Sequence, residues 1–218
     1  MTQSPAPRPS PDHYFAWPNR ITLLRLILIA PFVWLMLHQQ QRPGYRQAAV
    51  VIFLVMALSD LLDGLLARRY NLKSRLGAIL DPIADKTLIT CAAILLTLDV
   101  SHVAEARLPD WAVVAIIGKD LWVVVGFMVV FLVTGRVRVH PTWPGKAATA
   151  AQAAMVLAIL LSHELNMLGQ WLAGYNTGLA LATATWWAAA AFSVLAAISY
   201  TRLGWRYLAE AANAPHEK

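Results

Sequence analysis

The stretch SDLLDGLLARRYNLKSRLGAILDPIADK, residues 59–86, places four aspartates on two neighbouring apolar segments that are long enough to cross a membrane. The four are Asp60, Asp63, Asp81 and Asp85. An ionisable residue inside a bilayer is costly, and it is therefore a functional hypothesis by default. Without a cation nearby, the four carboxylates would repel one another and take up protons. Oxygen ligands of this kind suit magnesium, manganese or calcium, so the stretch predicts a site for one or two divalent ions.

Helical spacing supports a single site. At about 100° per residue, Asp63 lies roughly 60° around the first helix from Asp60, and Gly64 and Ala67 share that face. A second stripe, at positions i, i+4 and i+8 of the next helix, consists of Gly77, Asp81 and Asp85. A single aspartate at a span end is most often an N-cap or a solvated residue. Four at these spacings favour a site.

The composition predicts a membrane protein. The chain has 218 residues, of which 58% are hydrophobic and 14% charged, and its mean hydropathy is +0.53. The charged fraction of a soluble domain is usually about a quarter. We expect an all-α, polytopic fold with six transmembrane helices and a polar cavity that faces the cytoplasm. The predicted spans are Ile21–His38, Gln47–Leu66, Gly77–Asp99, Pro109–Thr134, Ala147–His163 and Gly178–Tyr200.

The distribution of charge predicts the topology. The net charge is +6, and most basic residues fall on the side that carries both termini. The positive-inside rule therefore places both termini in the cytoplasm, as for a multi-pass protein of a bacterial inner membrane. Nucleic acid is not an expected partner, because no basic helix or aromatic platform accompanies the charge. We expect a disordered tail over residues 1–13, one membrane domain over 14–207 and a C-terminal tail over 208–218.

The aspartate stretch also carries a family resemblance. The pattern Asp60-x-x-Asp63-Gly64-x-x-Ala67-Arg68, eight residues, Gly77-x-x-x-Asp81-x-x-x-Asp85 resembles the signature of the CDP-alcohol phosphatidyltransferases, and all eight fixed positions match. The resemblance implies that the four aspartates bind two ions of Mg²⁺ or Mn²⁺. It also implies that Asp85 is the catalytic base, although a role as metal ligand alone remains open. The implied pocket for the CDP-lipid consists of Asp60, Gly64, Ala67, Arg68 and Gly77. Arg68 could instead be one more charge that sets topology.

Three further motifs predict an acceptor site. Pro18-Asn19-x-x-Thr22-x-x-Arg25 resembles a motif of phosphatidylglycerophosphate and cardiolipin synthases, and Gly145-Lys146-x-x-Thr149-x-x-Gln152 resembles a run of the former. Lys119-Asp120 stands where both groups usually have arginine before an acidic residue. An arginine can bind an anion through two hydrogen bonds at once, whereas the lysine here offers a single ammonium charge. The expected acceptor-binding residues are Arg25, Lys119, Lys146 and Thr149. Arg25 could instead extend to the membrane surface, and a pair of Lys119 with an aspartate could simply hold helices together.

The resemblance implies transfer of a phosphatidyl group from CDP-diacylglycerol to an alcohol, with release of CMP. The expected acceptor is a small phosphorylated alcohol, sn-glycerol 3-phosphate, because three cations suit a phosphomonoester. The nearest alternative is a cardiolipin synthase that uses phosphatidylglycerol. An alternative of another class is a cation carrier with intramembrane aspartates. Membrane lipid is an expected partner, and the resemblance alone implies a homodimer.

Overall fold

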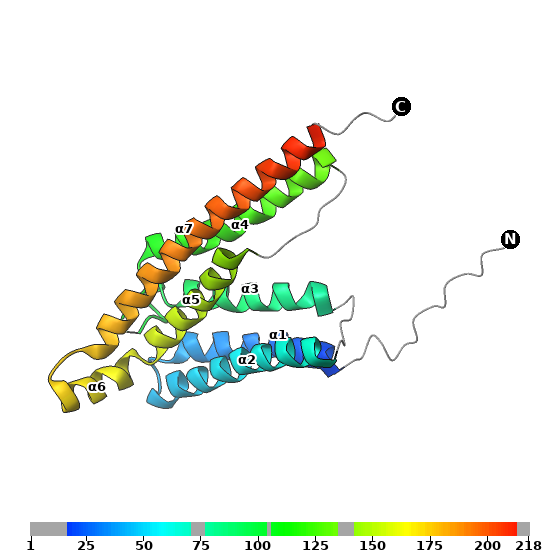
Figure 1. Cartoon of the computed structure of the whole chain (residues 1–218). Coiled ribbons are helices and arrows are strands. Elements are labelled where there is room, and N and C mark those ends of the chain that lie inside the picture. Colours follow the sequence, from blue (N-terminus) through cyan, green and yellow to red (C-terminus); the bar gives the residue numbers. More distant parts are fainter. Residues whose placement is uncertain (1–16, 71–76, 104–105, 135–141, 213–218) are drawn as a thin grey trace. The chain divides into compact units, whose positions relative to one another are not determined.

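The computed structural model describes residues 17–70, 77–103, 106–134 and 142–212, and within these it contains seven α-helices and no strand (Figure 1). Side chains are described for the same residues except 17–20, 43, 61, 63–70, 77–82, 173 and 211–212. The helices are α1 (Trp17–His38), α2 (Pro43–Tyr70), α3 (Gly77–Leu95), α4 (Asp110–Thr134), α5 (Trp143–Leu160), α6 (Ser162–Ala173) and α7 (Thr177–Ala212). The predicted all-α class is confirmed for this part of the chain.

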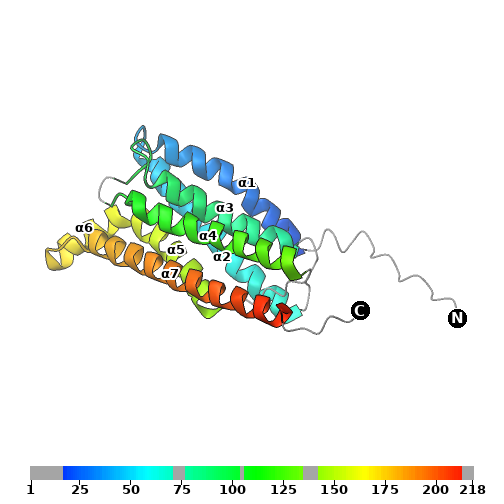
Figure 2. The same ribbon diagram turned by 90° about the horizontal axis from the view of Figure 1, so that it is seen from above.

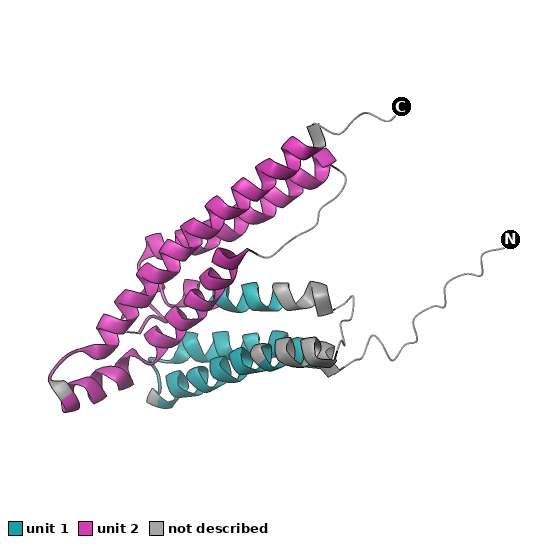
Figure 3. Ribbon diagram, viewed as in Figure 1, with its two compact units in different colours: residues 1–91 teal, residues 92–218 magenta. Residues whose placement is uncertain are grey.

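The chain divides into two compact units (Figure 3). The first covers residues 1–91 and the second residues 92–218, so the boundary falls inside α3. The aspartate stretch lies entirely in the first unit. The predicted acceptor residues are split between the units, with Arg25 in the first and the others in the second.

The first unit is built on a pair of packed helices, α1 and α2. The rings of Phe32 and Phe53 lie 6.0 Å apart at the centre of the pair. Trp34 contacts Tyr45 near the connecting loop, at 5.4 Å between ring centroids. Residues late in α1 thus face residues early in α2, which makes the pair antiparallel. Burial of large apolar side chains stabilises it, since Phe32, Phe53 and Met36 are almost fully buried.

In the second unit α4 runs parallel to α7. Trp111 packs on Trp187 at 4.8 Å, and Phe127 packs on Tyr200 at 5.8 Å, so both helices advance in the same direction. The two ribbons lie side by side along their length in both views (Figure 2). Because α4 and α7 run in the same direction, the chain between them must cross the unit in the opposite direction.

That return is α5, which runs antiparallel to α7. Its buried Gln152 donates from Nε2 to Ser193 Oγ at 3.1 Å, and its first turn lies against Tyr200. Thr142 begins the helix by accepting a hydrogen bond from the Gly145 N–H at 3.3 Å. Gln152 and Ser193 are both buried, and the serine hydroxyl accepts from the Gln152 amide while it donates to the Ala189 carbonyl oxygen at 2.6 Å.

A short helix that the sequence did not predict, α6, follows α5 at a bend of 67°. It ends at Gly174, whose φ of 71° is the left-handed conformation that glycine adopts without strain. Its exposed large apolar side chains share one face, at spacings of i, i+1, i+4 and i+5. They are Met167, Leu168, Trp171 and Leu172.

The membrane prediction is confirmed in part. Among the described residues three helices are long and apolar enough to span a bilayer, within Ile21–His38, Asp110–Thr134 and Thr177–Glu210. The bent pair of α5 and α6 adds a fourth if it counts as one span. Because α2 and α3 include residues whose side chains are not described, the six spans and the cytoplasmic cavity remain predictions.

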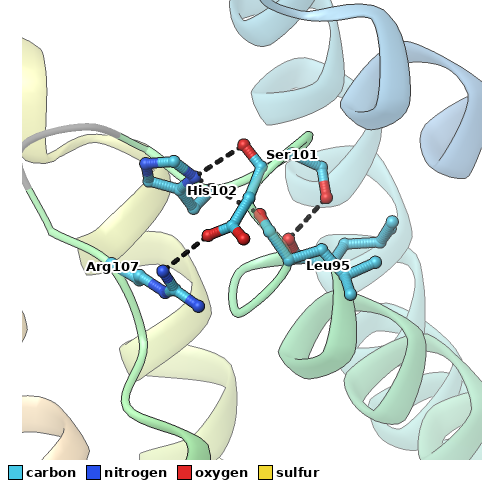
Figure 4. A network of polar contacts seen from close by, with 6 residues as sticks. Leu95, Ser101, His102 and Arg107 are labelled. Atoms are coloured by element: carbon cyan, nitrogen blue, oxygen red, sulfur yellow. Dashed lines mark hydrogen bonds and ion pairs between the residues drawn. The ribbon is translucent and has the colours of Figure 1, made fainter.

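The segment between α3 and α4 is held by its own polar contacts (Figure 4). Ser101 Oγ donates to the Leu95 carbonyl oxygen at 2.6 Å, and this serine is fully buried. The Arg107 guanidinium pairs with the Asp99 carboxylate at 2.6 Å on the surface. The buried hydrogen bond ties Ser101 to the end of α3, whereas the surface ion pair adds little to stability.

Candidate active site

The clearest polar contact of the first unit joins Arg25 of α1 to Asp60 of α2. The Arg25 Nη1 atom donates to Asp60 Oδ1 at 2.7 Å. The Arg25 side chain is only 2% exposed, whereas that of Asp60 is 49% exposed. The carboxylate therefore pairs with a buried cation through one oxygen and is still accessible to solvent, while the buried Arg25 Nε has no hydrogen-bond partner among the described residues.

Thr22 lies one turn before Arg25 on α1 and is fully buried. Both residues thus belong to the face of α1 that packs in the unit, together with Ile29 and Phe32. The predicted alternative for Arg25, extension to the membrane surface, is wrong, because its side chain is buried against a carboxylate.

Asp85, the predicted catalytic base, is the second aspartate of the stretch whose side chain is described. It lies on α3 and is half-buried. This burial suits a group that must exchange a proton with a ligand without full exposure to water.

The remaining candidates of this stretch lie outside the described side chains. They are Asp63, Gly64, Ala67, Arg68, Gly77 and Asp81. Their backbones belong to α2 and α3, so the helical spacing expected of them holds. Among the described residues there is no group of three His, Cys, Asp or Glu side chains that could hold a metal ion. Two of the four predicted ligands, Asp63 and Asp81, have side chains outside the described residues, so this absence does not concern them.

The described ligand candidates fit a divalent ion in chemistry. Asp60 and Asp85 offer carboxylate oxygens, which are the donors that magnesium and manganese prefer. Asp60 has one oxygen on Arg25 and is exposed enough to accept a second cation. The donor set is therefore compatible with the predicted ions.

In the second unit Lys119 forms an ion pair with its neighbour on α4. The Nζ atom lies 3.0 Å from Asp120 Oδ1, and the two side chains are 6% and 18% exposed. This pair joins adjacent residues of one helix, so it does not itself join two helices as the alternative supposed. It keeps an ammonium group inside an apolar helix at reduced cost.

Lys146 and Thr149 occupy the first turns of α5. Lys146 is exposed, and Thr149 is half-buried and donates from its hydroxyl to the Gly145 carbonyl oxygen at 3.3 Å. A Cβ at Gly145 would lie 2.6 Å from Tyr200 Oη, so only glycine leaves room for this tyrosine. Gly145 thus permits a close approach of α7. The exposed side chain of Lys146 is accessible to a ligand.

Sequence reasoning did not identify two features of these sites. It did not connect Arg25 to Asp60, since the residues are 35 positions apart and nothing local links them. It also did not place Tyr200 beside the Gly145 motif. The only sequence signal for the Arg25–Asp60 contact was that an arginine inside a membrane span needs an anionic partner.

Comparison with known proteins agrees with the motif. The model of the family described as CDP-alcohol phosphatidyltransferase matches residues 15–195. The chain is 33% identical over 204 residues to a Bacillus subtilis CDP-diacylglycerol–glycerol-3-phosphate 3-phosphatidyltransferase, covering 89% of this chain and 97% of the relative. It is 36% identical over 140 residues to a probable phosphatidylglycerophosphate synthase of Mycobacterium tuberculosis, covering 63% of this chain and 62% of the relative.

A third relative carries a different name. It is a cardiolipin synthase (CMP-forming) and mitochondrial hydrolase fusion protein of Schizosaccharomyces pombe, 35% identical over 120 residues, which are 55% of this chain and 18% of the relative. The family match extends over most of the chain, includes the whole aspartate stretch and contains the Arg25–Asp60 pair. The chain therefore belongs to the CDP-alcohol phosphatidyltransferase family.

Proposed function

We propose that this protein transfers a phosphatidyl group from CDP-diacylglycerol to sn-glycerol 3-phosphate and releases CMP. The observation that carries the proposal is the near full-length similarity to a relative named for that reaction, together with the complete aspartate signature. The family match over residues 15–195 supports a catalytic membrane domain over 14–207. Family membership argues against the cation carrier, since a phosphatidyltransferase explains the aspartates by chemistry.

The proposed reaction replaces one phosphorus–oxygen bond by another. The acceptor hydroxyl oxygen attacks the phosphorus that bears diacylglycerol, and the bond from that phosphorus to the CMP oxygen breaks. Asp85 takes the proton of the hydroxyl as general base. The electron pair of the broken bond leaves with CMP.

Two divalent ions, held by Asp60, Asp63, Asp81 and Asp85, would supply positive charge beside the diphosphate. Arg25 would assist them as a positioning residue, because its guanidinium group holds one oxygen of the Asp60 carboxylate. Gly64, Ala67, Arg68 and Gly77 complete the proposed CDP-lipid pocket. Small residues allow close approach of the nucleotide, and an arginine can contact two phosphate oxygens at once.

The acceptor phosphate is assigned to Lys146 and Thr149, with Lys119 as a further cation. Lys146 is exposed at the start of α5, which leaves its ammonium group accessible to a soluble anion. Arg25 and Lys119 are already paired with carboxylates, so their share in the acceptor site is smaller than the sequence predicted.

The topology of the second unit is consistent with the proposed six spans. Helix α5 runs back along α7, and α4 and α7 run the same way, as consecutive crossings of one bilayer require. With both termini in the cytoplasm of a bacterial inner membrane, Lys146 and the C-terminal end of α7 lie on the cytoplasmic side. Dimer formation stays part of the proposal on the strength of the resemblance.

The test is release of CMP from CDP-diacylglycerol by purified protein, with radiolabelled sn-glycerol 3-phosphate recovered in the lipid fraction. Label in the lipid and CMP in equal amounts support the proposal. A second candidate, cardiolipin formation from phosphatidylglycerol, rests on the relative of that name. Release of CMP only when phosphatidylglycerol is supplied would favour it.

A further inference from the structure

A hollow between α4 and α7 is lined, within the described part of the chain, by none of the residues assigned to the reaction. It has a volume of about 250 Å³ and is lined almost wholly by apolar and aromatic side chains. Trp122 and Val130 of α4 form one wall, and Trp205 and Leu208 of α7 form the other. Glycines on both helices leave its floor open, since a Cβ at Gly126 would meet no atom within 4 Å.

Two arginines stand at the rim of this groove. Arg202 and Arg206 are one turn apart on α7 and line an adjoining hollow that also includes Trp122 and Trp205. Both guanidinium-bearing side chains are exposed. A pair of arginines one turn apart can hold a phosphate group through several charge-assisted hydrogen bonds.

Contacts between α4 and α7 show which part of α4 lies beside the two arginines. Trp122 Nε1 donates to Thr201 Oγ1 at 2.9 Å, and a Cβ at Gly204 would lie 3.6 Å from Val130. Arg202 is therefore level with the apolar half of α4, and Arg206, one turn further along α7, lies toward the end of α4 at Thr134. Residues 121–133 of α4 contain no ionisable residue, and most of their large side chains are exposed, as for a helix surface that faces lipid.

We propose that the groove binds one anionic phospholipid, with its phosphate on Arg202 and Arg206 and an acyl chain between α4 and α7. The positive charge of the two guanidinium groups favours an anionic ligand. The apolar surface beside them favours an anion that is itself held in the membrane. Basic pockets between membrane helices bind lipid head groups for this reason. The apolar groove provides the complementary place for a hydrocarbon chain.

The experiment is native mass spectrometry of the full-length protein in detergent after delipidation, titrated with phosphatidylserine or with phosphatidylcholine of the same acyl chains. Phosphatidylserine is neither the proposed donor nor either candidate acceptor, and the variants below assign its binding to this groove. We expect one tightly retained phosphatidylserine per protomer, with an affinity at least about tenfold above that for phosphatidylcholine. Arg202→Gln combined with Arg206→Gln should abolish the difference.

Two matched pairs of variants separate head group from chain. Gly126→Leu fills the groove and should weaken retention of both lipids, whereas Gly118→Leu adds the same side chain to α4 outside the lining of the groove and should not. Arg42→Gln removes an exposed arginine outside the groove and should leave the preference intact. Equal affinity for the two lipids in the wild type, or a preference that survives the double arginine variant, would overturn the proposal. So would a Gly126→Leu protein that retains lipid normally but loses self-association, because the occupant would then be a second copy of the chain.

Discussion

Arg25 and Asp60 form an ion pair of 2.7 Å between α1 and α2, and the arginine is almost fully buried while the aspartate is half exposed. The pair joins the first predicted acceptor motif to the first predicted metal ligand. It explains how a guanidinium group is retained inside a membrane helix, since its charge is balanced by a carboxylate. It also orients that carboxylate before any ligand binds.

The pair should contribute measurable stability. Arg25→Gln and Asp60→Asn should each lower the melting temperature of the detergent-solubilised protein by several degrees, because each leaves a group without its charged partner. The double variant should be little worse than the poorer single variant, with a coupling free energy of about 1–3 kcal/mol. Thermal unfolding without divalent metal isolates this effect from metal binding.

A matched cycle gives the control. Arg42 is exposed and lies in the loop between α1 and α2, so Arg42→Gln should be additive with Asp60→Asn. If Arg25→Gln and Asp60→Asn were also additive, the ion pair would not stabilise the unit.

Metal removal provides the second prediction. Excess chelator should abolish turnover, and added magnesium or manganese should restore it, because the four aspartates hold the ions that neutralise the diphosphate. Asp60→Asn and Asp81→Asn should each lose most of the rate while the protein still elutes as a folded particle. Full turnover in excess chelator contradicts the two-metal proposal.

The third prediction separates the base from a simple ligand. Asp85→Asn should nearly abolish turnover yet leave the affinity for CDP-diacylglycerol within about tenfold, since binding and chemistry are different contributions. The measurement pairs single-turnover kinetics with equilibrium binding of the donor. A parallel fall in affinity and rate would assign Asp85 to the metal alone.

The fourth prediction concerns the acceptor phosphate. Lys146→Ala should raise the KM for sn-glycerol 3-phosphate by about ten- to a hundredfold, as expected when a charged hydrogen bond of roughly 1.5–3 kcal/mol is lost. The KM for CDP-diacylglycerol should not change. Lys86 of α3 is also exposed, and Lys86→Ala is the control that should leave the acceptor KM unaltered. Equal effects of the two variants would remove Lys146 from the acceptor site.

The sequence predicted the long helices well because their residues form uninterrupted apolar blocks. Each predicted span falls largely within a helix, although α7 continues to Ala212, beyond the predicted end at Tyr200. Helix α6 was missed because its pattern is short and amphipathic, and a search for spans does not register it. Its signal was present in the spacing of Met167, Leu168, Trp171 and Leu172.

The sequence indicated which residues are candidates for the site, but it did not indicate which of them contact one another. The aspartate spacing identified the family, since a signature on two helices is local in sequence. The partner of Arg25 lies on a different helix, and no periodicity identifies such a pair. Lys119 was assigned to the acceptor from its motif, and that role stays a prediction beside its ion pair with Asp120.

The identity of the acceptor decides between a phosphatidylglycerophosphate synthase and a cardiolipin synthase. Purified protein is given CDP-diacylglycerol and either sn-glycerol 3-phosphate or phosphatidylglycerol, and kcat/KM for CMP release is compared. We predict a far higher kcat/KM for sn-glycerol 3-phosphate, because an exposed Lys146 suits a soluble phosphomonoester with roughly two charges better than a lipid phosphodiester with one. A higher value for phosphatidylglycerol would contradict the account and make the protein a cardiolipin synthase with the same catalytic aspartates.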